Sequence, residues 1–322
     1  MEVPILKEDL REYMRKVIEN LKSLPPKDVL SYAIFNEEDE AEYYRKLAEH
    51  ARRESIRVLF LQMSEESLQH KEKLYKLFKK LYPNEEPRKI EAPPVEVVPL
   101  YPKFETVEDY LEALEYCMKS ELFAKDTYEI LAQKAINEES RVIFLQLAEM
   151  ERDHYERLKK AYDLFTSLKS RKMMPEYLKP GGYLFFDKFK ARYTFLDLVS
   201  NNRDGFIFSR DPPNLIKEWM KNENLSITWI STAPLKGSVT PRAFLDSKED
   251  LIEIMKRGRM VFLVESIEFI IAKEGFKETF ELISALRDVA IVSNSHLLVH
   301  STRDTLNERE KAILEAELQV IE

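Results

Sequence analysis

The distribution of glycine divides this chain into two parts with different folding tendencies. All six glycines lie between Gly181 and Gly275, so the first 180 residues contain none. Because glycine weakens helices and marks turns, a glycine-free stretch rich in Glu, Lys, Leu and Ala strongly favours helix. The chain has 322 residues, which is enough for about two domains with separate cores. We therefore expect an N-terminal helical domain followed by a domain of another class.

The second part alternates short β-branched and aromatic segments with helical patterns. Five strands are predicted, near residues 183, 206, 226, 260 and 296. This alternation is typical of a mainly parallel α/β sheet domain. Between the two parts, RKMMPEYLKPGG contains two prolines and two glycines, which predicts a linker over residues 171–182. The domains are accordingly predicted at 1–170 and 183–322.

Composition excludes several classes of function. No apolar run approaches the roughly 20 residues that cross a bilayer, and the N-terminus does not read as a targeting signal, so we expect a cytoplasmic protein without a membrane partner. The net charge is −8 and no basic patch stands out, which argues against a nucleic-acid partner. The single cysteine, Cys117, excludes internal disulfides, Cys-ligated zinc and four-cysteine iron centres.

The helical part contains an internal repeat at an offset of 84 residues. Residues 37–51 align with 121–135, and 57–74 align with 141–158, without a gap. Each copy predicts two helices, and these cover about 27–52, 54–81, 107–135 and 138–168. The proline-rich link between the copies is long, whereas the link inside each copy is short, a pattern typical of a four-helix bundle with one long crossover. Thr106 is the predicted start of the third helix, and residues 7–22 predict an extra helix outside the four.

Polar residues interrupt the apolar stripe of each helix at repeat-equivalent positions. The equivalent pairs are Glu37 with Glu121, Ser67 with Glu151, and His70 with His154. A carboxylate on a buried helix face costs several kcal/mol unless a cation compensates its charge. Glu151 and His154 are three residues apart on one helix and can therefore share a metal ion.

These residues match a known type of metal centre. One Glu from each of two helices, with Glu-x-x-His from each of the other two, is the ligand set of di-iron and di-manganese carboxylate bundles. Oxygen and imidazole ligands suit iron or manganese, and zinc can occupy the same atoms. We expect two iron ions, or one if the half of the site that contains Ser67 is lost, with manganese or zinc as the alternatives. No catalytic residue is expected apart from the metal ligands.

Residues 27–168 resemble the ferritin-like superfamily, and specifically its rubrerythrin branch. The shared pattern is a Glu seven residues before a Tyr, then Leu-Ala, then a later Glu-x-x-His, which appears here as Glu37 to Tyr44 and Glu121 to Tyr128 followed by Glu151 to His154. The resemblance implies a ferritin-like bundle whose di-iron site is oxidised by peroxide or oxygen and is reduced by an electron-transfer protein. Because a single cysteine cannot supply a rubredoxin-like module, the electron donor is expected to be a separate protein. Bundles of this type often pair, so a homodimer is expected.

The sequence departs from the family pattern at two ligand positions. Ser67 stands where a bridging carboxylate is expected, and Glu66, four residues before His70, is the predicted substitute. Position 124 is alanine where rubrerythrins carry an extra glutamate, and Glu40 occupies the corresponding place in the first copy. The full set of predicted metal ligands is Glu37, Glu40, Glu66, His70, Glu121, Glu151 and His154.

Two interpretations of the helical domain stay open. In the first, it is a di-iron redox enzyme that acts on peroxide or oxygen. In the second, it is a non-enzymatic iron-sensing or redox-sensing protein, in which the Glu and His residues form a hydrogen-bonded relic of a metal site. Tyr44 and Tyr128 resemble residues that lie near the metals in the rubrerythrin family, but we favour core packing for both, because aromatic residues at this spacing usually pack in the core.

The second part resembles an uncharacterised family of mainly archaeal domains. The shared motifs are G-x-x-x-S-R at 205–210, W-I-S at 229–231 and V-E-S-I-E-F-I at 264–270. That family has no assigned activity, and the chain has no phosphate-binding G-x-x-x-x-G-K-[ST] motif, so nucleotide hydrolysis is disfavoured. Arg210, Ser231 and Glu265 follow predicted strands and form a weak candidate cleft. The alternative, which we favour, is that they are turn caps and surface charges.

Overall fold

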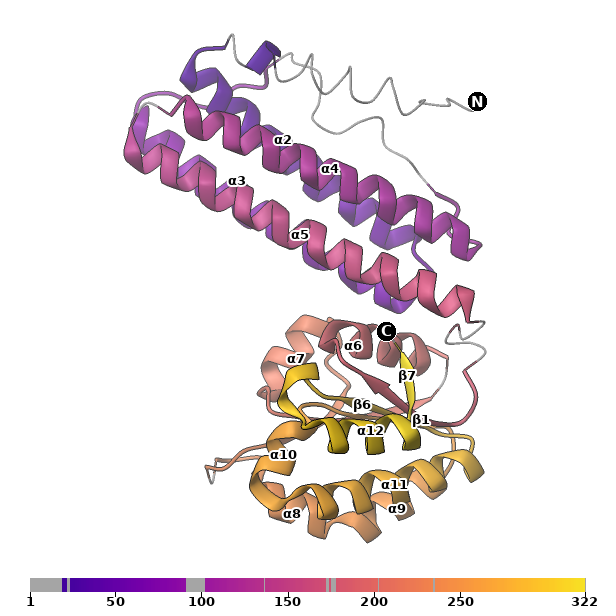
Figure 1. The fold of residues 1–322 in the computed structure, drawn as a ribbon. Coiled ribbons are helices and arrows are strands. Elements are labelled where there is room, and N and C mark those ends of the chain that lie inside the picture. Colours follow the sequence, from indigo (N-terminus) through magenta and orange to yellow (C-terminus); the bar gives the residue numbers. More distant parts are fainter. Residues whose placement is uncertain are drawn as a thin grey trace. The chain divides into compact units, whose positions relative to one another are not determined.

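The computed structural model describes residues 19–21, 24–90, 102–135, 137–171, 174, 178–201, 203–233 and 235–321. The chain folds into two compact units, one helical and one built around a sheet (Figure 1). Most of the helix predicted over 7–22 lies outside the described residues, which include only 19–21 of it.

The helical unit consists of four long helices that form two hairpins. Their bounds are α2 Pro26–His50, α3 Glu54–Leu81, α4 Val107–Gln133 and α5 Glu138–Ser170. Each helix begins and ends within two residues of the predicted position. The predicted start at Thr106 is confirmed by a capping box, in which the Thr106 side chain accepts from the backbone N–H of Asp109 and the Asp109 carboxylate accepts from that of Thr106.

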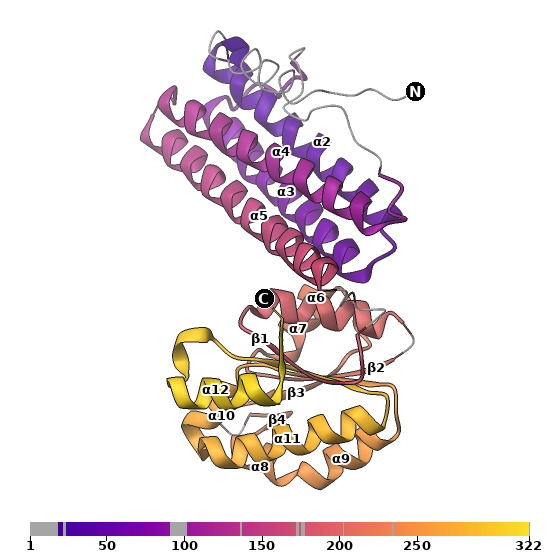
Figure 2. The same ribbon diagram turned by 45° about the vertical axis from the view of Figure 1, so that its right-hand side comes forward.

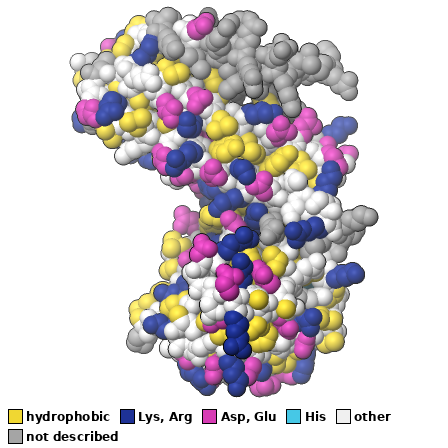
Figure 3. Space-filling view, viewed as in Figure 1, with side chains coloured by type: hydrophobic (Ala, Val, Ile, Leu, Met, Phe, Trp, Pro, Cys, Tyr) yellow, Lys and Arg dark blue, Asp and Glu magenta, His cyan; other side chains and the backbone are white. Residues whose placement is uncertain are grey.

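An apolar core holds the four helices together, and their outer faces are charged. One cluster of buried side chains draws on all four helices, including Leu30, Phe78, Leu131 and Leu147. Acidic and basic side chains are interspersed on the face of the bundle that Figure 3 shows, as expected for helix faces in contact with water. Among the described residues, no helix is long and apolar enough to cross a membrane.

The second unit contains a seven-stranded sheet in which all neighbouring strands are parallel. The strand order is β4-β3-β2-β5-β6-β1-β7. The strands are β1 Gly181–Phe185, β2 Asp204–Ser209, β3 Ser226–Ile230, β4 Ser238–Val239, β5 Met260–Val264, β6 His296–His300 and β7 Gln319–Ile321. The five predicted strands are confirmed. The two edge strands β4 and β7 were not predicted, because they are too short to show an alternating pattern.

Helices cover both faces of the sheet (Figures 1 and 2). One face carries α6 Lys188–Val199 and α7 Pro213–Met220. The other carries α8 Pro241–Asp246, α9 Lys248–Lys256, α10 Ile267–Glu274, α11 Phe276–Val292 and α12 Glu308–Glu317. At Gly205 on β2 an added Cβ would lie 2.6 Å from the Phe195 ring and 2.7 Å from Val199, both on α6. Only glycine therefore permits this close approach of helix and strand.

Both histidines of β6 are buried in the sheet core. The Nε2 of His296 lies 3.1 Å from the carbonyl oxygen of Leu178, and its ring stacks on Tyr183. The Nδ1 of His300 accepts from the backbone N–H of Ser266 at 3.4 Å. Burial disfavours the charged imidazolium, so it lowers the pKa of His300 and lowers that of His296 to about 4.

These histidines make the sheet unit sensitive to acid. The unfolded chain, in which histidine has a pKa of about 6.5, binds more protons than the folded chain between pH 6.5 and 4, so the stability present above pH 6.5 is lost as the pH falls. We expect His296 alone to cost about 2 kcal/mol between pH 8 and pH 5. Urea unfolding followed by tryptophan fluorescence measures this, because Trp219 and Trp229, the two tryptophans of the chain, both lie in the sheet unit.

The matched control is His296→Gln, which keeps a donor for the Leu178 carbonyl but does not titrate. Its loss of stability between the same two pH values should be smaller than that of the wild type. An equal loss in the two proteins would contradict this assignment.

Candidate metal centre

Three glutamates and two histidines meet inside the bundle. The residues are Glu37 from α2, His70 from α3, Glu121 from α4, and Glu151 and His154 from α5. All five side chains are at most 1% exposed. Each of the five is a predicted metal ligand, and the structure brings all five together.

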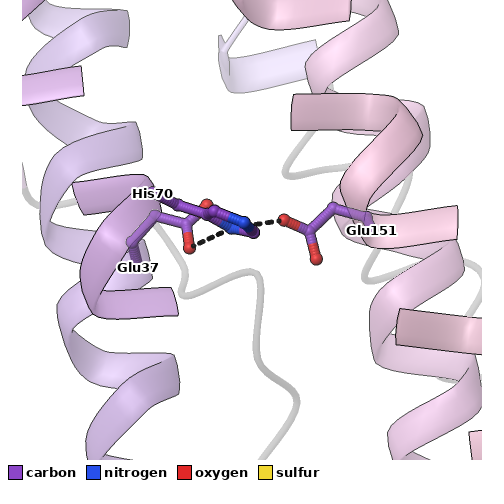
Figure 4. Close-up of side chains that lie close together, drawn as sticks. All are labelled: Glu37, His70 and Glu151. Carbon is purple, nitrogen blue, oxygen red and sulfur yellow. Dashed lines mark ion pairs between the residues drawn. The ribbon is translucent and has the colours of Figure 1, made fainter. Parts of the chain in front are cut away.

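They form two clusters that share one residue. Glu37, His70 and Glu151 make the first cluster, and Glu121, Glu151 and His154 make the second. In each cluster, one ligand atom from every residue lies within 4.8 Å of the others. Glu151 stands between the two halves, because one of its oxygens lies 3.3 Å from Nδ1 of His70 and the other lies 3.2 Å from Nδ1 of His154 (Figure 4 shows the first half).

The two halves are arranged alike, as the internal repeat requires. Nδ1 of His70 lies 3.3 Å from Glu37, and Nδ1 of His154 lies 3.3 Å from Glu121. The two imidazole rings are stacked, with their centroids 5.4 Å apart. Both histidines therefore present the same nitrogen, Nδ1, to the carboxylates.

Burial and mutual charge shift the pKa values of this cluster strongly. Burial raises the pKa of Glu37, and it raises that of Glu121 to about 7, against the opposing effect of the neighbouring histidine in each case. For Glu151 burial acts in the same direction, but His154 and His70 outweigh it and hold its pKa well below the usual range. Without a metal, Glu151 is accordingly a carboxylate between two imidazole rings.

The neighbouring glutamates favour the charged imidazolium form of both histidines. Burial alone lowers the pKa of His70, but the charges of Glu37 and Glu151 outweigh this effect and raise it to about 9. Burial also lowers the pKa of His154, but Glu121 and Glu151 outweigh this effect and raise it well above its ordinary value. The positive charge that balances the buried carboxylates is thus carried by protons on imidazole, and a bound metal displaces such protons.

Several buried atoms of the cluster have unused hydrogen-bonding capacity. Within the described part of the chain, no hydrogen-bond partner is found for Oε2 of Glu37, both ring nitrogens of His70 or either oxygen of Glu151. A buried polar atom without a partner costs about 1–3 kcal/mol. Oxygen and nitrogen atoms of this type, facing one another, fit a divalent cation such as iron or manganese.

Two tyrosines donate hydrogen bonds to glutamates of the cluster. Tyr44 donates its hydroxyl hydrogen to Glu121, and Tyr128 donates to Glu37. Burial and the adjacent carboxylate raise the pKa of each phenol well above its ordinary value, so both remain donors. Their interpretation as core residues is confirmed, because both rings are buried, and the structure adds one hydrogen bond from each hydroxyl to the cluster. The spacing in the sequence does not reveal these bonds, because each Tyr follows the Glu of its own copy by seven residues but donates to the Glu of the other copy.

The remaining candidate residues lie around the cluster. The buried Ser67, at the position equivalent to Glu151, donates to the carbonyl of Met63 at 2.9 Å. Glu40 is buried, and its charge contributes to the raised pKa values of Tyr44 and Tyr128. Its predicted role as a metal ligand stays a prediction.

Glu66 lies on the other side of His154 from the central carboxylates. Its Oε2 is 3.0 Å from Nε2 of His154, and its Oε1 accepts from Arg157 at 2.9 Å. Hydrogen bonds from these two residues overcome the effect of burial and lower the pKa of Glu66 to about 2. Glu66 thus lies behind His154 in this structure, and its predicted role as a metal ligand in place of Ser67 stays a prediction.

The candidate cleft of the sheet unit has a different character. Glu265 is fully buried and forms a two-pronged ion pair with Arg192, at 2.6 and 2.9 Å. Arg210 stacks over the ring of Phe269, with its guanidinium carbon 3.7 Å from the ring centroid, and the Ser231 hydroxyl accepts from the backbone N–H of Ala233. Ser231 is thus a turn cap, as we favoured, and Arg210 is an exposed charge, but Glu265 is a buried ion-pair partner and not a surface charge.

The fold and the two clusters together define a four-helix bundle with a carboxylate and histidine site of the type that holds metal ions. Residues 28–162 match the family model described as Rubrerythrin, and residues 185–318 match a model described as a protein of unknown function, DUF835. The chain thus combines a rubrerythrin-family domain of the ferritin-like type with a DUF835 domain, which confirms both resemblances.

Comparison with individual proteins adds little. A hypothetical protein from Pyrococcus furiosus with a solved structure is 28% identical, over 46% of this chain and 95% of that chain, with a TM-score of 0.43. No curated protein matches the chain.

The tyrosine hydrogen bonds lead to a prediction about stability. Tyr44→Phe and Tyr128→Phe each remove one donor from a buried glutamate, and each is expected to destabilise the metal-free bundle by about 1–3 kcal/mol. Chemical unfolding followed by circular dichroism at 222 nm measures this loss. Tyr75→Phe is the control, because the exposed Tyr75 donates to the exposed Glu86 and its loss should cost little. The assignment would be contradicted if all three variants were equally stable.

Proposed function

We propose that the bundle binds two metal ions, preferably iron, and that this centre carries out redox chemistry with peroxide or oxygen. The observation that carries the proposal is the pair of buried three-residue clusters that share Glu151. The match to the rubrerythrin family favours iron over manganese and zinc, which suit the same atoms.

Each residue of the cluster has a defined task in this proposal. Glu37 and His70 would hold one ion, Glu121 and His154 the other, and Glu151 would contact both. When bound, the iron pair supplies electrons to peroxide or oxygen. Tyr44 and Tyr128 hold the outer glutamates in place, and the surrounding apolar core keeps bulk water away from the cluster.

In this proposal the electrons come from a separate protein. A single buried cysteine, Cys117, cannot hold an iron–sulfur or four-cysteine iron centre. We propose a separate electron-donor protein as the partner of the bundle, which is the arrangement expected from the sequence. Pairing of two chains into a homodimer is part of the same proposal.

A second candidate function is a non-enzymatic iron-sensing or redox-sensing role. It is favoured by Ser67 at the position of a second bridging carboxylate, and by the fusion to a domain without known activity. Metal binding is common to both functions, whereas turnover belongs only to the first.

Metal content tests the site itself. The full chain, loaded with ferrous iron without oxygen and freed of excess metal, is expected to retain about two irons per chain. Glu121→Ala and His154→Ala remove ligands and should lower this number by about one or more. The control is Glu149→Ala on the same helix, since Glu149 is exposed and pairs with Arg152. Equal iron content in all four proteins would overturn the proposed site.

Reaction with peroxide separates the two functions. For the enzyme, iron in the protein should be oxidised by peroxide at least ten times faster than the same iron in buffer, as measured by stopped-flow absorbance. A reductant-coupled assay should then show repeated turnover. A protein that binds iron but gives no acceleration would favour the sensing role.

A further inference from the structure

The two histidines of the metal centre differ in what lies behind them. The outer nitrogen of His154, Nε2, is 3.0 Å from the carboxylate of Glu66. Arg157, one helical turn after His154, binds both oxygens of that carboxylate. Glu66 is about one-third exposed and Arg157 less, so this three-residue chain runs from the cluster to the surface of the bundle.

The internal repeat shows what the other half has instead. At the offset of 84 residues, Met150 corresponds to Glu66, and Lys73 corresponds to Arg157. These residues also meet, since Nζ of Lys73 lies 3.5 Å from Sδ of Met150. The contact between neighbouring helices is therefore preserved by the duplication, but a thioether replaces the carboxylate.

This replacement leaves His70 without the support that His154 has. Among the described residues, no hydrogen-bond partner is found for Nε2 of His70. A thioether is only a weak acceptor, whereas a carboxylate accepts an imidazole N–H strongly. Glu66 thus favours a hydrogen on Nε2 of His154, so Nδ1, which faces Glu121 and Glu151, is the nitrogen that would give up its proton to a metal ion. Among the described residues, no carboxylate is found in the equivalent place behind His70.

Outer hydrogen bonds of this kind affect how tightly a metal is held. A carboxylate behind a metal-binding histidine fixes the ring orientation and its tautomer and makes the ring a stronger ligand. Loss of such a partner typically costs 10–100-fold in metal affinity. The two clusters otherwise contain the same residue types, one Glu and one His each, with Glu151 shared. Glu40, whose counterpart in the second copy is Ala124, lies outside both clusters.

We propose that Glu66 is a positioning residue that makes the two metal sites unequal. A divalent cation binds first, and more tightly, to the half formed by Glu121, Glu151 and His154. The half formed by Glu37, Glu151 and His70 fills second. This inference rests on the proposed function only in assuming that the cluster binds metal.

Variants that retain one half each allow a direct comparison. Glu37→Ala leaves the His154 half intact, and Glu121→Ala leaves the His70 half intact. The probe is ferrous iron alone, titrated without oxygen into the metal-free full chain and followed by calorimetry. We expect Glu37→Ala to bind iron about 10–100-fold more tightly than Glu121→Ala does.

The repeat supplies matched second substitutions. Adding Glu66→Met should weaken binding about 10-fold or more in the Glu37→Ala protein, and should leave the Glu121→Ala protein unchanged. Adding Met150→Glu should strengthen iron binding in the Glu121→Ala protein, because it places a carboxylate at the repeat-equivalent position of Glu66. Lys73, which contacts Met150, can form an ion pair with that carboxylate. Circular dichroism melting curves verify that each variant is folded.

The conservative variant Glu66→Gln separates orientation from charge. Its amide oxygen still accepts the Nε2–H bond, so it should lose less affinity than Glu66→Met. An equal loss would show that only the negative charge acts, and would overturn the positioning role.

The outcomes distinguish this inference from the proposed function. Equal affinity of the two single-half proteins, or no effect of Glu66→Met in either, would overturn the inference while the proposed metal centre stands. Failure of the unsubstituted chain to bind iron would overturn both.

Discussion

The whole bundle depends on the compensation of charge around Glu151. Three carboxyl groups and two imidazoles are buried at the centre, and an isolated charge at such a place would cost several kcal/mol. Glu151 avoids this cost because a histidine stands on each side of it, and Glu37 and Glu121 accept hydrogen bonds from tyrosines. All four helices must be in register for these contacts to form, so the same interactions specify the packing of the bundle and assemble the site. Removal of any one member leaves a buried charge or acceptor without its partner.

The duplication explains how a chain can acquire such a site. Each helical hairpin provides a glutamate, a tyrosine and a histidine, but the tyrosine of one hairpin serves the glutamate of the other: Tyr44 reaches Glu121, and Tyr128 reaches Glu37. In neither hairpin does the tyrosine donate to the glutamate of the same hairpin. The exchange of hydrogen bonds couples the two copies, and it persists even though the copies have diverged at Ser67 and Glu151 and at Glu66 and Met150. The inner ligands of the two halves are alike because they come from the two copies of the repeat. Their surroundings differ because the two copies have diverged.

Much of this arrangement can be predicted from the sequence, and the features that could not be predicted have physical reasons. The helices α2–α5 are long and periodic, and the repeat locates all five central residues, because a polar residue on an apolar stripe is visible at any position. The pattern of polar and apolar residues does not show which atoms a side chain contacts. Glu66 sits one step off the stripe, and only the structure shows that its carboxylate meets the outer nitrogen of His154. Tyr44 and Tyr128 look like ordinary core residues, since a hydroxyl hydrogen bond across the bundle leaves no mark on periodicity. In the sheet unit β4 and β7 are too short for any pattern, and their pairing comes from the rest of the sheet.

The two buried ionic clusters of this chain differ in the source of their positive charge. In the sheet unit, Glu265 is neutralised by Arg192, which also binds Asp211, and Ser209 donates to the same carboxylate. A guanidinium does not give up its proton in a protein, so that cluster is closed and needs no further cation. In the bundle the positive charge is carried by protons on His70 and His154, and imidazole can exchange a proton for a metal ion. The same principle of charge compensation thus produces a structural ion pair in one unit and a site open to a cation in the other. This difference is the physical reason for placing the chemistry of the protein in the bundle.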